Sequence, residues 1–129
     1  MTTDGRKGEH MKVAVSASGK DLQAQVDPRF GRAAGFIIAD PETLDFELVE
    51  NTQNIRAAQG AGIQAATLVA RHKAEVVLTG HCGPKAFQTL RAAGIQVVTG
   101  VSGTVKEVLA RFQEGEYTFA AAPNAEGHW

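Results

Sequence analysis

Short apolar runs separated by glycine-rich loops make up the first part of the chain, and a helical period appears only later. Lys12–Ala17, Gly35–Asp40 and Asp45–Asn51 have the length and the β-rich composition of strands. The last two are joined by the short polar segment 41–44, which is typical of an antiparallel hairpin. We therefore predict three strands here, with a long loop at 18–34 between the first and the second.

After a second glycine-rich loop, 51–62, the apolar positions follow a period near 3.6, which is typical of an amphipathic helix. We expect this helix to end near His72. One face of it carries four apolar residues: Ile63, Ala66, Val69 and Ala70. Two strands of the buried type are predicted further on, at Glu75–Thr79 and Ile95–Thr99.

Two more helices are predicted from the signals at their ends. The helix Pro84–Ala93 begins with proline at its first position and is closed by Gly94. Thr104 and Glu107 have the spacing of a capping box, and Gly115 ends the helix that follows them. Residues 116–129 show no clear element, so we expect a C-terminal tail there.

The resulting order, β-β-β-α-β-α-β-α, predicts an α/β fold with a single mixed five-stranded sheet and helices packed on it. Right-handed crossovers make the first, fourth and fifth strands parallel, and the hairpin returns the third strand to their direction. The carboxyl ends of these four strands then share one edge, from which the loops 17–34, 51–62, 79–85 and 99–104 leave. Because ligands of open α/β sheets bind at such an edge, we predict the functional site there.

Composition and charge narrow the class of protein. The 129 residues suffice for one domain, which we place at 11–115, after a polar leader at 1–10 that we expect to be disordered. A formal net charge of −1 gives no broad positive surface for nucleic acid or membrane, and no apolar run approaches the ~20 residues of a bilayer span. The single cysteine excludes an internal disulfide and favours a reducing, cytoplasmic setting. We expect a monomer.

The most informative segment is 76–85 (VVLTGHCGPK), where a predicted strand passes through a glycine-rich turn into a helix. Such a turn points backbone N–H groups and the positive end of the helix dipole at one spot, which suits an anion. His81 and Cys82 add an imidazole and a soft sulfur, and we expect the dipole to lower the pKa of the thiol. Cys82 is therefore a candidate metal ligand, and Lys85 a candidate counter-charge.

Three motifs in these loops resemble a known family. They are DPRFGR at 27–32 before an FII-x-D strand, GAGI at 60–63 before a helix, and GPKAF at 83–87 with Leu90 and AGI at 93–95. Together they are similar to the dinitrogenase iron–molybdenum cofactor binding proteins over about residues 11–115. The resemblance implies a ribonuclease H-like fold, and the binding and carriage of a metal–sulfur cluster in place of catalysis.

Two branches of that family stay open. The orange-protein branch implies a molybdenum–copper sulfide cluster held without covalent bonds to the protein. The alternative is a carrier of the iron–molybdenum cofactor or its precursor in nitrogenase cofactor assembly, where partner proteins would receive it. The chain departs from many members at Cys82 and at Lys85, which leaves the branch undecided.

The motifs and the sheet edge together define the candidate cofactor-binding residues. These are Arg29, Phe30, Gly31, Arg32, His81, Cys82, Gly83, Pro84 and Lys85. A guanidinium at position 29 or 32 would meet the sulfide or oxo edge of an anionic cluster. In a purely structural alternative, Arg29 lies in a turn and pairs with Asp27 or with a carbonyl at the end of a strand. Lys20 and Arg56 add positive charge to the same edge.

Other classes of function are less well supported. A ribonuclease H-type nuclease needs several carboxylates around two metal ions, and the first strand, KVAVSA, carries none. Adjacent Cys and His residues in a turn do not easily form the nucleophile–base pair of a hydrolase. We therefore expect no enzymatic activity, and an interaction or regulatory module without a cluster stays the third alternative.

Overall fold

The computed structural model describes residues 11–51 and 60–124, so the predicted leader at 1–10 lies outside the described residues. Five strands and three helices occur in the described ranges, in the predicted order. The strands are β2 (Val13–Ala17), β3 (Gly35–Ala39), β4 (Phe46–Glu50), β5 (Val76–Leu78) and β6 (Gln96–Val98). The helices are α2 (Ala61–Arg71), α3 (Pro84–Ala92) and α4 (Val105–Gln113).

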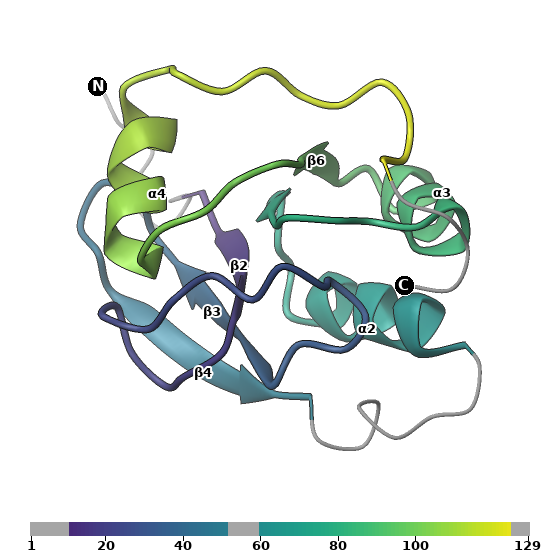
Figure 1. The fold of residues 1–129 in the computed structure, drawn as a ribbon, viewed down its shortest axis with the longest axis horizontal. Helices are drawn as coiled ribbons and strands as arrows, with labels where there is room; N and C mark the ends of the chain where they lie inside the picture. The colour runs from purple at the N-terminus through teal and green to yellow at the C-terminus, as the bar shows by residue number, and fades with distance from the viewer. Residues whose placement is uncertain (1–10, 52–59, 125–129) are drawn as a thin grey trace.

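The strands form one mixed sheet in the order β4-β3-β2-β5-β6 (Figure 1). β3 pairs antiparallel with both β2 and β4, whereas β2 pairs parallel with β5 and β5 with β6. The carboxyl ends of β2, β4, β5 and β6 therefore lie at the same edge. This confirms the predicted ribonuclease H-like α/β architecture and the predicted strand directions.

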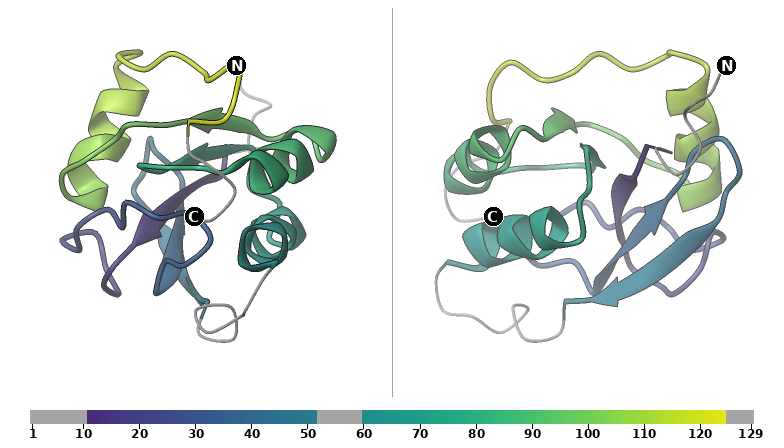
Figure 2. Two further views of the ribbon diagram at one scale, coloured as in Figure 1. Left: turned by 45° about the vertical axis from the view of Figure 1, so that its right-hand side comes forward. Right: turned by 180° about the vertical axis from the view of Figure 1, so that it is seen from behind.

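The helices cover both faces of the sheet, with α2 and α3 side by side on one face and α4 on the other (Figure 2). Successive side chains of β2 point to opposite faces of the sheet, so the strand contributes to a separate core on each face. Ala14 belongs to the cluster under α2 and α3, whereas Val13 and Val15 pack with Val105 and Leu109 of α4. Val13 and Val15 thus share the face of the sheet that α4 covers. No helix among the described residues is long and apolar enough to cross a membrane.

The buried face of α2 differs from the predicted one. The helix begins at Ala61, its buried residues are Ala61, Ala65, Ala66 and Val69, and the predicted Ile63 is 38% exposed. Small side chains let α2 approach α3 closely, so the alanine face turns inward. Ile63 lies on the far side of the helix from Ala61 and Ala65, because residues two apart differ by about 200° around the axis.

Residues 116–124 form neither helix nor strand, as predicted, but they lie on the domain. After α4 the tail crosses the molecule toward α3 (Figure 1). The N–H of Ala120 donates to the carbonyl of Val97 in β6 at 2.7 Å, and the half-buried Tyr117 packs against the α4 side of the core. Residues 125–129 of the predicted tail lie outside the described residues.

Candidate anion-binding site

Two of the predicted site segments are joined by backbone hydrogen bonds. Arg29 and His81 form a parallel β-bridge. The N–H of His81 donates to the carbonyl of Pro28 at 2.7 Å, and the N–H of Phe30 donates to the carbonyl of His81 at 3.1 Å. A Cβ on Gly80 would lie 2.8 Å from Cα of Pro28, so the two loops can approach this closely only with glycine at that position.

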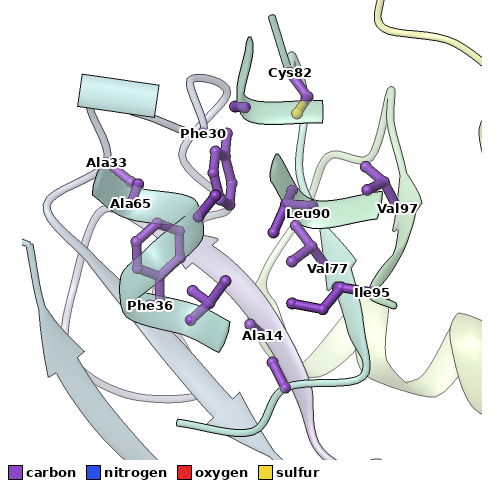
Figure 3. Close-up of a cluster of buried hydrophobic side chains, with 14 of the residues drawn as sticks. Ala14, Phe30, Ala33, Phe36, Ala65, Val77, Cys82, Leu90, Ile95 and Val97 are labelled. Atoms are coloured by element: carbon purple, nitrogen blue, oxygen red, sulfur yellow. The ribbon is translucent and has the colours of Figure 1, made fainter. Parts of the chain in front are cut away.

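Alternation along the bridge separates the side chains into two sets. Bridge partners project their side chains to the same side, so Arg29 and His81 face outward together. Phe30 and Cys82, one residue further on, lie in the core with relative exposures of 1% and 0% (Figure 3). The ring of Phe30 lies 5.2 Å from that of Phe36, centroid to centroid. Phe30 and Cys82 thus support the site from beneath.

Burial determines the protonation state of the cysteine. Cys82 is a free, buried thiol, and burial raises its pKa to about 12. The expectation that the helix dipole lowers this pKa is wrong, because the cost of desolvating a thiolate in the core outweighs the dipole of α3. The folded protein therefore presents a neutral thiol beneath the loop.

The helices at this edge have open N-termini. Gly60 and Gly83 are the N-cap residues of α2 and α3, and no side chain among the described residues caps either helix. Neither first turn contains an acidic residue. The third helix is different, because Thr104 and Glu107 form the predicted capping box there. First-turn N–H groups lack intrahelical acceptors, so α2 and α3 offer donors and a positive dipole end to an anion.

Close contacts between backbones hold these helix ends beside the arginine loop. A Cβ on Gly62 would lie 3.0 Å from Cβ of Ala86, so the first turns of α2 and α3 are in contact. A Cβ on Gly31 would lie 2.9 Å from Cα of Gly62, so the loop also rests on α2. Three of the glycine-rich segments predicted to share this edge are therefore brought together.

Asp27 holds Arg29 in place. Its Oδ1 accepts from the backbone N–H of Arg29 at 3.0 Å and lies 3.9 Å from Nε of the same residue. The structural pairing that was predicted as an alternative therefore exists. The Arg29 side chain nevertheless remains 49% exposed, so its guanidinium is both positioned and accessible to a ligand.

Buried polar side chains that the sequence analysis did not single out anchor the loops. Asn51, at the end of β4, donates from Nδ2 to the carbonyl of Ala33 at 2.9 Å and to that of Gly31 at 3.3 Å. The hydroxyl of Ser16 donates to the carbonyl of Asp27 at 2.7 Å and lies 2.8 Å from that of Thr79. A signal for them was available at the ligand-binding edge, since Asn51 and Thr79 directly follow β4 and β5 and Ser16 is the last residue but one of β2.

The tail contributes another anchor that sequence analysis missed. Asn124 donates from Nδ2 to the carbonyl of Gly80 at 2.9 Å and accepts at Oδ1 from the N–H of Cys82, also at 2.9 Å. Its own N–H lies 3.3 Å from the carbonyl of Cys82. Residues 116–129 show no apolar period and no clear element, so the sequence analysis did not point to Asn124.

The remaining predicted residues lie as follows. Gly83 and Pro84 begin α3 as predicted, Lys85 is exposed on its first turn, and Arg32 is half-buried in the arginine loop. Lys20 lines a separate hollow of about 160 Å³ with Leu48 and Glu50. Arg56 lies outside the described residues.

The donor set fits an anion better than a bare metal ion. Within residues 11–51 and 60–124, no three His, Cys, Asp or Glu side chains are grouped so that they could hold a metal. The site instead combines backbone N–H groups, two helix dipoles and outward-facing basic side chains. Such an arrangement binds a ligand through its negative outer atoms.

Comparison with known proteins gives the site a context. The family model described as dinitrogenase iron-molybdenum cofactor matches residues 11–115. The apo form of the orange protein from Desulfovibrio gigas is 47% identical, with a TM-score of 0.87 over 90% of this chain and 98% of that one. A putative NifB protein from Thermotoga is 37% identical, with a TM-score of 0.77 over 91% of this chain and 99% of that one.

A more distant relative is an uncharacterized protein from Methanocaldococcus jannaschii. It is 28% identical over 109 residues, which cover 82% of this chain and 88% of the relative. The similarity thus extends over nearly the whole described domain, including the loops at the carboxyl edge of the sheet.

Proposed function

The chain belongs to the dinitrogenase iron–molybdenum cofactor family, and from that premise we propose that it binds and carries an anionic metal–sulfur cluster without catalysing a reaction. The cluster would lie at the edge where the Arg29 loop meets the first turns of α2 and α3. The observation on which the proposal depends is the contrast between the helices. Among the described residues, α4 is capped by its own side chains, whereas α2 and α3 are left open where the basic residues gather.

The chemistry of a sulfide cluster matches this donor set. Its outer sulfides or oxo groups carry the negative charge, so they accept hydrogen bonds from first-turn N–H groups and from the guanidinium of Arg29. Lys85 adds a mobile positive charge on the first turn of α3. The metal ions need no protein ligand in such an arrangement, because the inorganic sulfides already coordinate them.

A noncovalent attachment is further supported by the state of the cysteine. A soft thiolate is the protein ligand that copper and sulfide clusters prefer. Cys82 is instead a fully buried thiol whose pKa is raised to about 12, so its ligation would require both a proton loss and movement out of the core. We therefore assign Cys82 a packing role and assign binding to the groups above it.

We propose a molybdenum–copper sulfide cluster as the cargo. The motifs of the sequence imply that ligand for the orange-protein branch, and the 47% identity to the Desulfovibrio gigas protein supports the branch. The alternative cargo is the iron–molybdenum cofactor or its precursor. The 37% identity to a putative NifB protein from Thermotoga supports that alternative.

The test is purification of the protein from its own host, followed by absorption spectroscopy and elemental analysis. We expect a charge-transfer band together with molybdenum and copper; iron with molybdenum would favour the alternative cargo. The apo protein is then titrated with tetrathiomolybdate and Cu(I), with α-helical content monitored in parallel. A folded protein that is colourless, free of metal and unable to take up these reagents would contradict the proposal.

A further inference from the structure

We infer that the C-terminal tail completes the cluster site, and that Asn124 is a positioning residue for the segment Gly80–Cys82. This inference rests on the proposed function, because it concerns the same site. It adds a segment of the chain that lies outside the matched region 11–115. Asn124 itself would contact no ligand; it acts through the loop that it holds.

The carboxamide of Asn124 makes the same pair of hydrogen bonds to the segment Gly80–Cys82 that a peptide group of a neighbouring strand would make. It donates to the carbonyl of Gly80 and accepts from the N–H of Cys82, both at 2.9 Å. A peptide group on an adjacent strand offers the same pair, one donor and one acceptor. The backbone N–H of Asn124 adds a third contact to the carbonyl of Cys82 at 3.3 Å.

The loop is therefore held from both sides. His81 points its N–H and carbonyl toward the arginine loop, where they bond to Pro28 and Phe30. The polar groups of Gly80 and Cys82 point the opposite way, toward Asn124, as successive residues of an extended chain do. The segment is the middle member of a three-part ladder, and the tail forms its outer side.

The N–H of Cys82 is the group that depends most on this contact. The carbonyl of Gly80 also accepts from the N–H of Gly100 at 2.9 Å, so it keeps a partner without Asn124. The Cys82 N–H would lose the acceptor that the structure gives it. Cys82 directly precedes Gly83, the N-cap of α3, so its position sets where the open end of that helix points. Fixing donors before the ligand arrives strengthens binding.

The rest of the tail places Asn124 where it can act. Ala120 is hydrogen-bonded to Val97 in β6, and Tyr117 packs against the α4 side of the core. With these contacts the tail runs past β6, the outermost strand of the sheet, from α4 toward α3 (Figure 1). Asn124 thus reaches its partners at the end of a path that is fixed along its length.

The experiment uses the full chain with Asn124→Ala and two readouts. The first is affinity for the cluster assembled from tetrathiomolybdate and Cu(I), which we expect to fall by about tenfold. The second is alkylation of Cys82 by a neutral maleimide in the apo protein, which we expect to accelerate by about the same factor as the loop opens more often. Asn124→Gln keeps the carboxamide and should restore part of both. Thr118→Ala, in the exposed part of the tail, should change neither.

Each other result counts against the inference. Faster labelling with unchanged affinity would mean that the tail holds the loop without contributing to the site. Unchanged labelling would mean that Asn124 does not hold the loop. If Asn124→Ala lowers the melting temperature, Leu109→Ala serves as a destabilised reference on the other face of the sheet. An equal loss of cluster affinity in Leu109→Ala would mean that Asn124→Ala weakens binding only by destabilising the fold. If the wild type takes up no cluster, the proposed function fails, and the tail has no cluster site to complete. The rate of Cys82 alkylation in the apo protein would still show whether Asn124 holds the segment Gly80–Cys82.

Discussion

Arg29 and His81 are partners in a backbone bridge although they lie far apart in the chain, and their side chains face outward on the same side of it. The bridge places the motif at 27–32 beside the segment 79–85, so that the two form one surface. Because the two hydrogen bonds of the bridge join main-chain atoms, they do not require the side chain of Arg29 or of His81. Substitutions at these two positions therefore change the charge and donors of the site while leaving the bridge itself in place.

Arg29→Ala should weaken retention of the cluster in a salt-dependent way. Loss of one accessible cation beside an anion is expected to cost about 1 kcal/mol, roughly fivefold in affinity, at low ionic strength. The difference from wild type should shrink at ~1 M salt, where the screening length is about 3 Å. Affinity is measured by titration with tetrathiomolybdate and Cu(I) at both ionic strengths.

Two controls accompany this variant. Arg29→Lys keeps the charge, and Arg71→Ala removes an exposed arginine from the opposite end of α2, away from the site. Arg71→Ala should bind like wild type. A loss in Arg29→Ala that is equal at low and high salt would contradict the electrostatic explanation.

Cys82→Ala should retain the cluster and lose some stability. The thiol lies in the core among apolar side chains, so its removal is expected to cost about 1 kcal/mol of unfolding free energy through lost packing. Metal content and the charge-transfer band of the folded variant are compared with those of wild type. A folded Cys82→Ala protein that no longer takes up copper would establish the thiol as a ligand and refute its packing role.

The raised pKa of Cys82 also predicts a loss of stability in alkali. The ordinary pKa of the thiol is 9.0 and the folded value is about 12, so above pH 9 the unfolded chain releases a proton that the folded chain keeps. This contribution is present in full below the unfolded pKa and is lost as pH rises, at about 1.4 kcal/mol per pH unit.

Urea unfolding of wild type and Cys82→Ala at about pH 8 and about pH 10 measures this effect. Other groups titrate in both proteins, so their contributions cancel in the comparison. The stability advantage of wild type should fall by about 1.4 kcal/mol between the two pH values. A constant difference would show that burial does not hold the thiol neutral.

Gly80→Ala should separate the two loops that form the site. The added Cβ would lie 2.8 Å from both Cα and the carbonyl oxygen of Pro28, and relief of such overpacking typically costs about 1–3 kcal/mol. Cluster affinity should fall with stability because the Arg29–His81 bridge is displaced. Gly94→Ala is the matched control.

Gly94 has a φ of +80° and open space around it, so alanine there costs about 1 kcal/mol by backbone strain, far from the site. It should lower the melting temperature and leave cluster affinity unchanged. Equal losses of affinity in the two variants would mean that the loop contact at Gly80 has no special role.

Local patterns were sufficient to predict most of the fold. The strands, the capping box of Thr104 and Glu107, and the start of α3 at Pro84 depend on neighbouring residues, and the structure confirms them. Chain direction rules then placed four loops at one edge. The prediction that Ile63 lies on the buried face of α2 is wrong, because the close approach of α2 to α3 favours small residues over large apolar ones.

Features that depend on distant contacts escaped prediction. The dipole at α3 was readable from the sequence near Cys82, but the depth of the core beneath it was not, and that depth sets the pKa. Asn124 is separated from its partners Cys82 and Gly80 by 42 and 44 residues of sequence. A single polar residue in a tail without periodicity gives no local sign of such a contact.

If the protein carries a cluster as we propose, the open first turns of α2 and α3 have a consequence for how that cargo leaves. No side chain among the described residues caps them, so water can hydrate their N–H groups when no ligand is bound. Loading then displaces water and unloading readmits it, so neither direction needs a chemical bond to be made or broken. In the proposed role, an acceptor with a denser set of donors would take the cargo by competition alone, and the empty protein would be ready to bind again.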